Sequence, residues 1–377
     1  MAVGRGRSSG DAGVLHDALN VFRTLLPPEW VIDRIDKELD AGTGGRVDAV
    51  VWVREPGGVA AAVLVEAARA FAPRDVEVLV ARGHRLLRQL DPDAVLLMVA
   101  QWLSPRTRIL LEEAGVGYLD LSGNALLRLD RPALFVRLMG ADQDPQPPRR
   151  GAVSLRGAAA GRVVRLLVDV VPPFTATAVA EKSGVSLPYV SRLLTMLDRE
   201  ALINRGRQGL VVGVDWAELL RRRAETYQVF GTNTAHGFVS SQGAREALRR
   251  MVVSTEPIYR AVTGSFAIGP LLEPVAAPSQ LIVYVENVAA TAQAMGLLPT
   301  DEGADVVLLT DFDYVVVDRP EYRYGYTVVR TSQLALDCLT GNGRLPAEGE
   351  ALLAWMGRNE WRYPSIDMVE QRAEIYP

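Results

Sequence analysis

Apolar and polar residues recur along the chain with periods that predict both helices and strands. Apolar positions at helical spacing predict an amphipathic helix at Val14–Leu26 and a second helical piece around Trp30–Leu39. Two apolar runs follow, RVDAVVWV (Arg46–Val53) and VAAAVLVEA (Val59–Ala67), and the turn-forming residues EPGG separate them. This arrangement is typical of a β-hairpin.

Helical and strand patterns continue to alternate after the hairpin. A helix is predicted at Pro73–Leu90, and SPRTRILLEEAG predicts a capped helix that ends at Gly115. DAVLLMVA is nearly continuous in apolar residues, as a buried strand is, and GYLDL, NALLRL and ALFVRL predict further short strands. The first part of the chain is therefore expected to form a mixed α/β core.

The segment GADQDPQPPRRG, residues 140–151, interrupts these periodic patterns with proline and charge and marks a domain boundary. After it, a short helical unit precedes a region in which apolar strands again alternate with helices. The expected organisation is a disordered lead-in (1–13), an α/β domain (14–140), a linker (141–152), a helical unit (153–216) and a second α/β domain (217–377).

Composition narrows the class of protein. Of 377 residues, 49% are hydrophobic and 23% charged, and no apolar run has the length of a membrane-spanning helix. The N-terminal segment lacks the apolar core of a secretory signal, so a cytoplasmic protein is expected. A single cysteine and three scattered histidines exclude a disulfide framework and argue against a Cys- or His-built metal site, and no cofactor is expected.

The segment ATAVAEKSGVSLPYVSRLLT, residues 176–195, has the pattern of a helix-turn-helix. Such a unit needs a small residue where its helices cross, a glycine at the turn and apolar residues that fix the pair. Ala180, Gly184, Val185, Val190 and Leu193 occupy these positions. The second helix places Val190, Leu193, Leu194 and Leu197 on one buried stripe.

The opposite side of this second helix and the hairpin after it supply the expected DNA contacts. ALINRGRQGLVVGVDW predicts a two-stranded wing with a basic, glycine-containing tip, so the unit is a winged helix-turn-helix. The expected DNA-binding residues are Ser186, Pro188, Tyr189, Ser191, Arg192, Thr195, Arg199, Arg205, Arg207 and Gln208. Basic residues also precede the unit, at Arg149, Arg150, Arg156, Arg162 and Arg165, although the net charge of the chain is −4. The alternative is a winged helix that contacts only proteins.

Two carboxylates in the predicted hairpin have the spacing of a nuclease metal site. Asp48 and Glu66 match the acidic residues of the restriction-endonuclease-like superfamily, in which two acids hold a divalent cation and a nearby lysine stabilises developing charge. At the position that corresponds to this lysine, the chain has Ala68. We therefore interpret Asp48 and Glu66 as vestigial candidates and expect no catalytic residue and no bound metal. One alternative is that no metal lies between the two acids, Asp48 being a charge at a strand end and Glu66 a hydrogen-bonded buried carboxylate. The other is that the pair has retained weak metal binding.

Longer stretches carry a resemblance to a protein family. LVEAARAFAPRDVEVL, LSPRTRILLEEAGVGYLDLSGNALLRL and ALFVRLMG resemble an actinobacterial group in which a restriction-endonuclease-like domain precedes a helix-turn-helix. This group belongs with the AbiEi-type transcriptional regulators of type IV toxin-antitoxin systems. The resemblance runs from about Val47 to Met356 and implies a cognate toxin as a partner. Where this family commonly has Glu-Val-Lys, the chain has Glu66, Ala67 and Ala68.

The last domain resembles a nucleotidyltransferase with an incomplete motif. In YRAVTGSFAIGPLLEPVAAPSQLIVYVEN, residues 259–287, Gly264 and Ser265 match the start of the phosphate-binding helix, but the following strand offers only Glu286 where two acids are needed. Asp311, Asp313 and Asp318 are further acids at loose spacing. We expect a degenerate domain that serves effector or partner recognition.

Together these patterns predict a DNA-binding transcriptional regulator with two catalytically degenerate flanking domains for sensing or dimerisation. Its expected partners are double-stranded operator DNA, a second copy of the chain and a cognate toxin, with no membrane. The alternative is a metal-dependent DNA nuclease that its own winged helix directs to its target.

Overall fold

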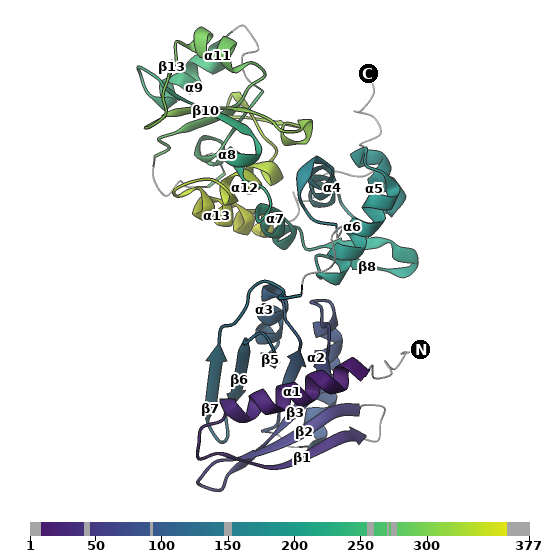
Figure 1. The fold of residues 1–377 in the computed structure, drawn as a ribbon. Helices are drawn as coiled ribbons and strands as arrows, with labels where there is room; N and C mark the ends of the chain where they lie inside the picture. Colours follow the sequence, from purple (N-terminus) through teal and green to yellow (C-terminus); the bar gives the residue numbers. More distant parts are fainter. Residues whose placement is uncertain are drawn as a thin grey trace. The chain divides into compact units, whose positions relative to one another are not determined.

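The computed structural model describes residues 9–40, 46–90, 93–146, 153–254, 260–269, 271–272 and 277–359. Contacts between Cα atoms divide the chain into two units, which are Met1–Ala152 with Arg199–Ala201, and Val153–Asp198 with Leu202–Pro377. Within the described residues, each unit contains a seven-stranded sheet with parallel and antiparallel pairs (Figure 1). The expected mixed α/β class is confirmed.

The first unit is one sheet with helices on both faces. Its strands follow one another in sequence order, from β1 to β7, and only the β3–β4 and β4–β5 pairs are parallel. The elements are α1 (Ser9–Leu25), β1 (Val31–Asp40), β2 (Arg46–Arg54), β3 (Ala60–Ala68), α2 (Asp75–Leu90), β4 (Val95–Ala100), α3 (Pro105–Glu113), β5 (Gly117–Asp120), β6 (Ala125–Leu129) and β7 (Leu134–Leu138).

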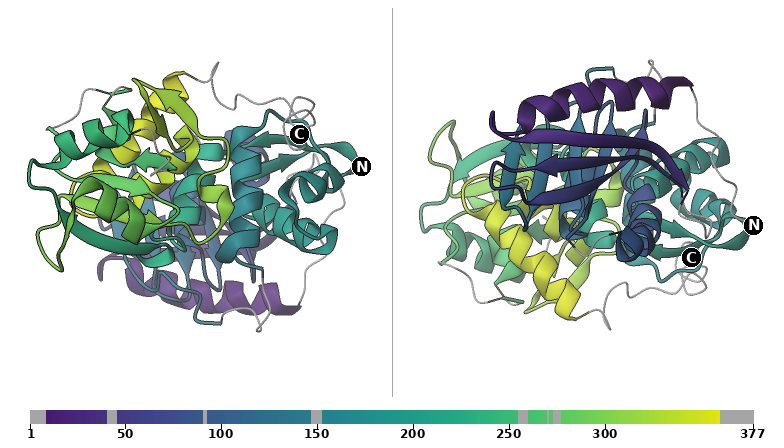
Figure 2. Two further views of the ribbon diagram at one scale, coloured as in Figure 1. Left: turned by 90° about the horizontal axis from the view of Figure 1, so that it is seen from above. Right: turned by 90° about the horizontal axis from the view of Figure 1, so that it is seen from below.

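Alternating residues of the strands form two separate cores. Val51, Val63 and Leu119 face the side that α1 covers, and Val50 and Leu64 face the side of α2 and α3 (Figure 2). This alternation follows the period of a strand, and it explains why the hairpin of β2 and β3 forms where the apolar runs predict it.

β1 occupies the segment around Trp30–Leu39, where apolar spacing predicts a helix, and this prediction is wrong. A β-bulge next to Ile32 lets Ile32 lie opposite Val53 while Ile35 lies opposite Val51. Both isoleucines therefore pack against the α1-side core although they are three residues apart. The bulge converts a helix-like spacing into a strand with one apolar face.

The expected ends of the first domain also differ from the structure. α1 begins at Ser9, so residues 9–13 are helical and do not belong to a disordered lead-in, whereas residues 1–8 lie outside the described residues. The start of the expected linker is fixed to the first unit, because the Ala141 N–H donates to the Ser122 carbonyl at 3.2 Å and Asp142 pairs with Arg108 at 2.6 Å. Residues 147–152 lie outside the described part.

The second unit begins with three helices and a two-stranded sheet and continues into the second seven-stranded sheet, of order β13-β10-β14-β12-β11-β16-β15. Its elements are α4 (Gly157–Asp169), α5 (Ala176–Ser183), α6 (Leu187–Arg199), β8 (Ile203–Arg205), η1 (Arg207–Gly209), β9 (Val211–Val214), α7 (Trp216–Ala224), α8 (Val229–Thr232), β10 (Thr234–Val239), α9 (Ala244–Val253), β11 (Ala261–Thr263), α10 (Ser265–Ile268), β12 (Leu281–Tyr284), α11 (Val288–Met295), β13 (Leu298–Pro299), β14 (Val306–Thr310), η2 (Tyr314–Val316), β15 (Glu321–Arg323), β16 (Tyr326–Val328), α12 (Thr331–Leu339) and α13 (Leu345–Arg358).

One hydrophobic core runs through the whole second unit, from Leu155 to Met356. The expected boundary between residues 216 and 217 falls inside α7, and the helical segment before it shares its core with the segment after it. Among the described residues, no helix combines the length and the apolar character that crossing a membrane requires.

Candidate nucleic-acid interface

Three helices, α4, α5 and α6, form the helical segment, and a tight turn separates α5 from α6. Val163, Val164 and Leu167 of α4 are buried in the common core. The Thr175 hydroxyl accepts from the Ala178 N–H at 3.1 Å and so caps the start of α5. Gly184 ends α5 in the left-handed conformation, with φ 63°, as the helix-turn-helix pattern predicts.

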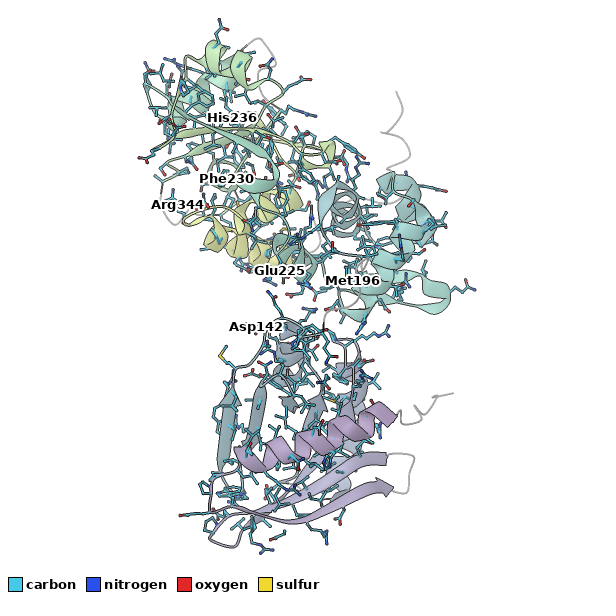
Figure 3. The ribbon with its side chains drawn as sticks, in the orientation of Figure 1. Asp142, Met196, Glu225, Phe230, His236 and Arg344 are labelled. Atoms are coloured by element: carbon cyan, nitrogen blue, oxygen red, sulfur yellow. The ribbon has the colours of Figure 1, made fainter. Side chains whose placement is uncertain are left out.

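α6 has one buried and one exposed side. Val190, Leu193, Leu194 and Leu197 are all fully buried, and the predicted stripe is confirmed. Met196 lies beside the stripe and is partly buried against the same core (Figure 3). Because this stripe fixes the rotation of α6 about its axis, it also fixes which side chains face solvent.

The exposed side of α6 is polar and cationic. The predicted contact residues Ser186, Pro188, Arg192, Thr195 and Arg199 are exposed, and Ser191 is half-buried beside them. The Arg192 Nε donates to the Pro188 carbonyl at 3.3 Å and the Thr195 hydroxyl donates to the Ser191 carbonyl at 2.8 Å, both one turn earlier in the helix.

Tyr189 departs from this exposed side. It is half-buried and packs against the common core, and burial raises the pKa of its hydroxyl. The reason is its position four residues before Leu193, which places it at the border of the buried stripe. Tyr189 is thus only partly exposed, where the pattern predicts it on the exposed face of the helix.

A short hairpin follows α6. β8 and β9 pair antiparallel, and Phe174, which precedes α5, forms an additional bridge to Val211 of β9. The hairpin is thereby tied to the start of α5 by two backbone hydrogen bonds, of 3.0 and 3.1 Å. Its orientation relative to α6 is fixed from both ends.

The hairpin tip carries three of the predicted contact residues. Gln208 is exposed and has a positive φ of 60°. Arg205 is half-buried at the end of β8, and its Nε has no hydrogen-bond acceptor among the described residues. The backbone of Arg207 lies in η1 at the tip, whereas its side chain is outside the described part of the structure.

The basic residues that precede the helical unit do not form one cationic surface. Arg162 donates to both carboxylate oxygens of Asp313, at 3.1 and 2.7 Å. Arg165 is buried and donates to the Val315 carbonyl and to Gln333, both at 3.0 Å. Of the others, Arg156 is exposed, and residues 149 and 150 lie outside the described residues. Two of the five arginines therefore attach α4 to the rest of the second unit.

Asp169, at the end of α4, is the centre of this attachment. It is fully buried, accepts from the Ser332 hydroxyl at 2.6 Å, and has Arg165, Arg330 and Arg319 within 3.3, 3.3 and 3.6 Å. Burial acts to raise the pKa of Asp169, but the three guanidinium groups outweigh it and lower that pKa. The ionised carboxylate therefore holds α4 against the segment that leads into α12.

Asp48 and Glu66 lie on adjacent strands of the first unit, and each has a protein partner. The pairing of β2 with β3 ends at Ala49 and Val65, which are the chain neighbours of Asp48 and Glu66. Asp48 accepts from the Ala67 N–H at 2.8 Å, and Glu66, whose side chain is 12% exposed, is 3.2 Å from Arg82 of α2. Within the described residues, no group of three or more His, Cys, Asp or Glu side chains is arranged to hold a metal ion.

The acids and the serine of the last domain also point to separate partners. The buried Ser265 hydroxyl donates to Glu348 at 2.6 Å, and Asp311 pairs with Arg260 at 3.0 Å. Asp313 pairs with Arg162, and Asp318 lies 2.9 Å from Arg319. Glu286 is exposed. Ser265 and three of the four acids are therefore each engaged by another residue of the domain or of α4.

Leu187 and Asn204 are exposed in the candidate interface and are absent from the predicted set. Leu187, the first residue of α6, is 43% exposed, and Asn204 of β8 is exposed. Leu187 lies between the predicted contacts Ser186 and Pro188, so its position in the sequence was enough to predict it as a further contact residue. Asn204 follows the buried Ile203 in β8, and the alternation of a strand would have predicted that its side chain faces solvent.

Comparisons with known proteins give little similarity. No family model matches the chain, and no curated protein matches it. Among solved structures, EndoMS in its apo form aligns at 17% identity with a TM-score of 0.22, over 31% of this chain and 48% of that chain. The EndoMS–dsDNA2 complex aligns at 17% identity with a TM-score of 0.23, over 32% and 48%. The chain thus spans about half the length of the solved structures that it matches.

Proposed function

We propose that the chain is a DNA-binding transcriptional regulator, and that the segment from α4 to β9 is a winged helix-turn-helix that binds double-stranded operator DNA. One observation carries the proposal. α6 follows a left-handed glycine turn, and its inner stripe is locked while its outer side presents Arg192, Thr195 and Arg199 to solvent. A helix so fixed can enter a major groove with a defined face.

The side chains of this face suit the chemistry of a groove. Arg192 offers paired donors for a guanine edge, and Thr195 and Ser186 offer hydroxyls to bases or phosphates. The exposed Leu187 supplies an apolar contact for a thymine methyl group. The β8–β9 tip, with Arg207 and Gln208, lies after α6 in the order that a wing requires for contact with the adjacent phosphates or minor groove.

We further propose that the flanking domains do not catalyse. The first unit has a restriction-endonuclease-like core without nuclease activity, which the Glu66–Arg82 ion pair and Ala68 support. The last domain is a degenerate nucleotidyltransferase-like domain for sensing, since Ser265 and Asp313 are bound to other residues. The resemblance to AbiEi-type regulators agrees with this function and adds a cognate toxin as a proposed partner.

Replacement of Arg192 tests the proposal. Fluorescence anisotropy with duplexes selected by the full chain from a random library measures specific affinity, and a scrambled duplex measures non-specific affinity. We expect Arg192→Ala to cost about 1–3 kcal/mol of specific binding, because a base contact is lost, with little change in non-specific binding. Arg249→Ala is the matched control, since Arg249 is also an exposed arginine and pairs with Glu246 on α9 of the same unit.

Two outcomes would contradict the proposal. Unchanged affinity of Arg192→Ala for the selected duplex would remove α6 from the interface and favour a winged helix that contacts only proteins. Cleavage of supercoiled plasmid in the presence of Mg²⁺ or Mn²⁺, lost in Glu66→Gln, would establish the alternative function of a DNA-directed nuclease.

A further inference from the structure

The two edges of the sheet in the first unit have opposite character. β1, at one edge, contains a β-bulge and the charged residues Asp33, Arg34 and Asp36. Bulges and charges are the devices by which proteins prevent an edge strand from pairing with another chain. β7, at the other edge, reads Leu-Phe-Val-Arg-Leu and carries neither device beyond one arginine.

β7 is also strongly exposed. Within the described residues it pairs only with β6. Phe135 is 63% exposed and Leu138 46%, and Met139, directly after the strand, is 85% exposed. Arg137 pairs with Glu112 of α3, and its guanidinium carbon lies 5.9 Å from the centre of the Phe135 ring. An apolar, unprotected edge with its backbone groups free on one side is a template for strand addition.

We propose that this edge is a homodimer interface, in which β7 pairs antiparallel with β7 of a second copy about a two-fold axis through Val136. The sequence of the strand is complementary to itself in this register. Phe135 lies opposite Arg137 of the second copy, and Leu134 lies opposite Leu138. A cationic side chain thus faces an aromatic ring twice across the axis, with favourable cation–π contact.

The faces of the paired strands also match. Leu134 and Val136 are partly buried against the α1-side core, so the pairing extends that core from one copy into the next. Phe135 and Arg137 lie on the opposite face, as their position in the strand requires. A two-fold axis through Arg137 would place arginine opposite arginine, and an axis through Phe135 would remove the pairing of Phe135 with Arg137, so the two-fold register through Val136 is the favoured one.

Replacement of Phe135 by residues of opposite charge tests the interface. Sedimentation velocity of the full chain at micromolar concentration should show a dimer. Phe135→Lys places a cation opposite Arg137 and should produce monomer, whereas Phe135→Glu places an anion there and should retain the dimer. Val31→Lys is the control on the other edge, where the side chain is 51% exposed, and it should leave the dimer intact. Circular dichroism verifies that each variant is folded.

A cysteine at the axis provides a second, independent measurement. Paired residues on the axis have Cα atoms roughly 4.5–5.5 Å apart, within the range of a disulfide. Val136→Cys should therefore form a covalent dimer under mild oxidation, while Val31→Cys and the wild type should not, since the native Cys338 is buried.

The proposal is overturned if the wild-type chain is monomeric, if Phe135→Lys and Phe135→Glu behave alike, or if Val136→Cys does not cross-link. None of these experiments uses DNA. Loss of the dimer interface and loss of the proposed DNA binding are therefore distinguishable.

Discussion

Asp169 shows how much of the second unit depends on a single buried charge. Its carboxylate is fully buried and has three arginines and the Ser332 hydroxyl around it, and two of those arginines come from the segment near α12. A buried charge of this kind is favourable only while its partners remain in place. Removal of the charge deprives three guanidinium groups of a shared anionic partner.

We expect Asp169→Asn to destabilise the second unit by about 3–5 kcal/mol at neutral pH, the usual cost of breaking a buried ion pair. The folded-state pKa of Asp169 is lowered, so its contribution is present above the ordinary carboxyl pKa and is lost as the pH falls through the lowered value. The difference between variant and wild type should therefore shrink in acid. Urea unfolding of the full chain at neutral and acidic pH measures it.

Asp318→Asn is the matched control for this experiment. Asp318 pairs with Arg319 but is 34% exposed, so its loss should cost only about 0–1 kcal/mol. Equal losses in the two variants, or a loss that does not change with pH, would contradict the assigned role of Asp169.

The turn between α5 and α6 decides the geometry of the candidate interface at the level of elements. Gly184 ends α5 with φ 63°, and a Cβ at this position would meet no atom within 4 Å. The requirement for glycine is therefore purely conformational. Since the turn sets the angle between the helices, strain at Gly184 acts on the exposed face of α6 as well as on stability.

Gly184→Ala is expected to cost about 1–2 kcal/mol, the penalty of the left-handed conformation for a residue with a Cβ. Gly184→Asn should cost clearly less, because asparagine adopts this conformation more readily. Thermal or urea unfolding measures both variants. If alanine and asparagine prove equally neutral, the turn has relaxed to another conformation and the glycine is not required.

At the scale of the whole molecule, the segment from α4 to β9 and the last domain share one hydrophobic core. The common core runs from Leu155 to Met356, and α4 is joined to distant residues by the Arg162–Asp313 pair and by the bond from Arg165 to Gln333. The segment 153–216 by itself would expose Arg165 and Asp169, which are both buried here.

We expect a fragment of residues 153–216 to lack a cooperative unfolding transition, whereas residues 153–377 should unfold in one sharp transition. Circular dichroism and the dispersion of amide NMR signals distinguish a folded from a disordered fragment. A folded 153–216 fragment would restore the domain boundary that the sequence pattern indicates and would make the contacts of α4 dispensable.

Local patterns were sufficient for many elements. The EPGG hairpin, the capped helix α3 and the short strands β5 to β7 form where turn residues and apolar runs predict them. β1 is the counterexample, because two isoleucines three residues apart suit a helix as well as a bulged strand, and only pairing with β2 selects the strand.

By itself, the sequence determined the buried stripe and the glycine turn of the candidate interface, because helical period and left-handed backbone geometry are local properties. The tertiary structure alone decided the departures from this pattern. Tyr189 borders the stripe and is partly buried against the core, and Arg162 and Arg165 are engaged by partners about 150 residues further along the chain. Such partners are brought together only by the fold, so no local pattern distinguishes these arginines from Arg192.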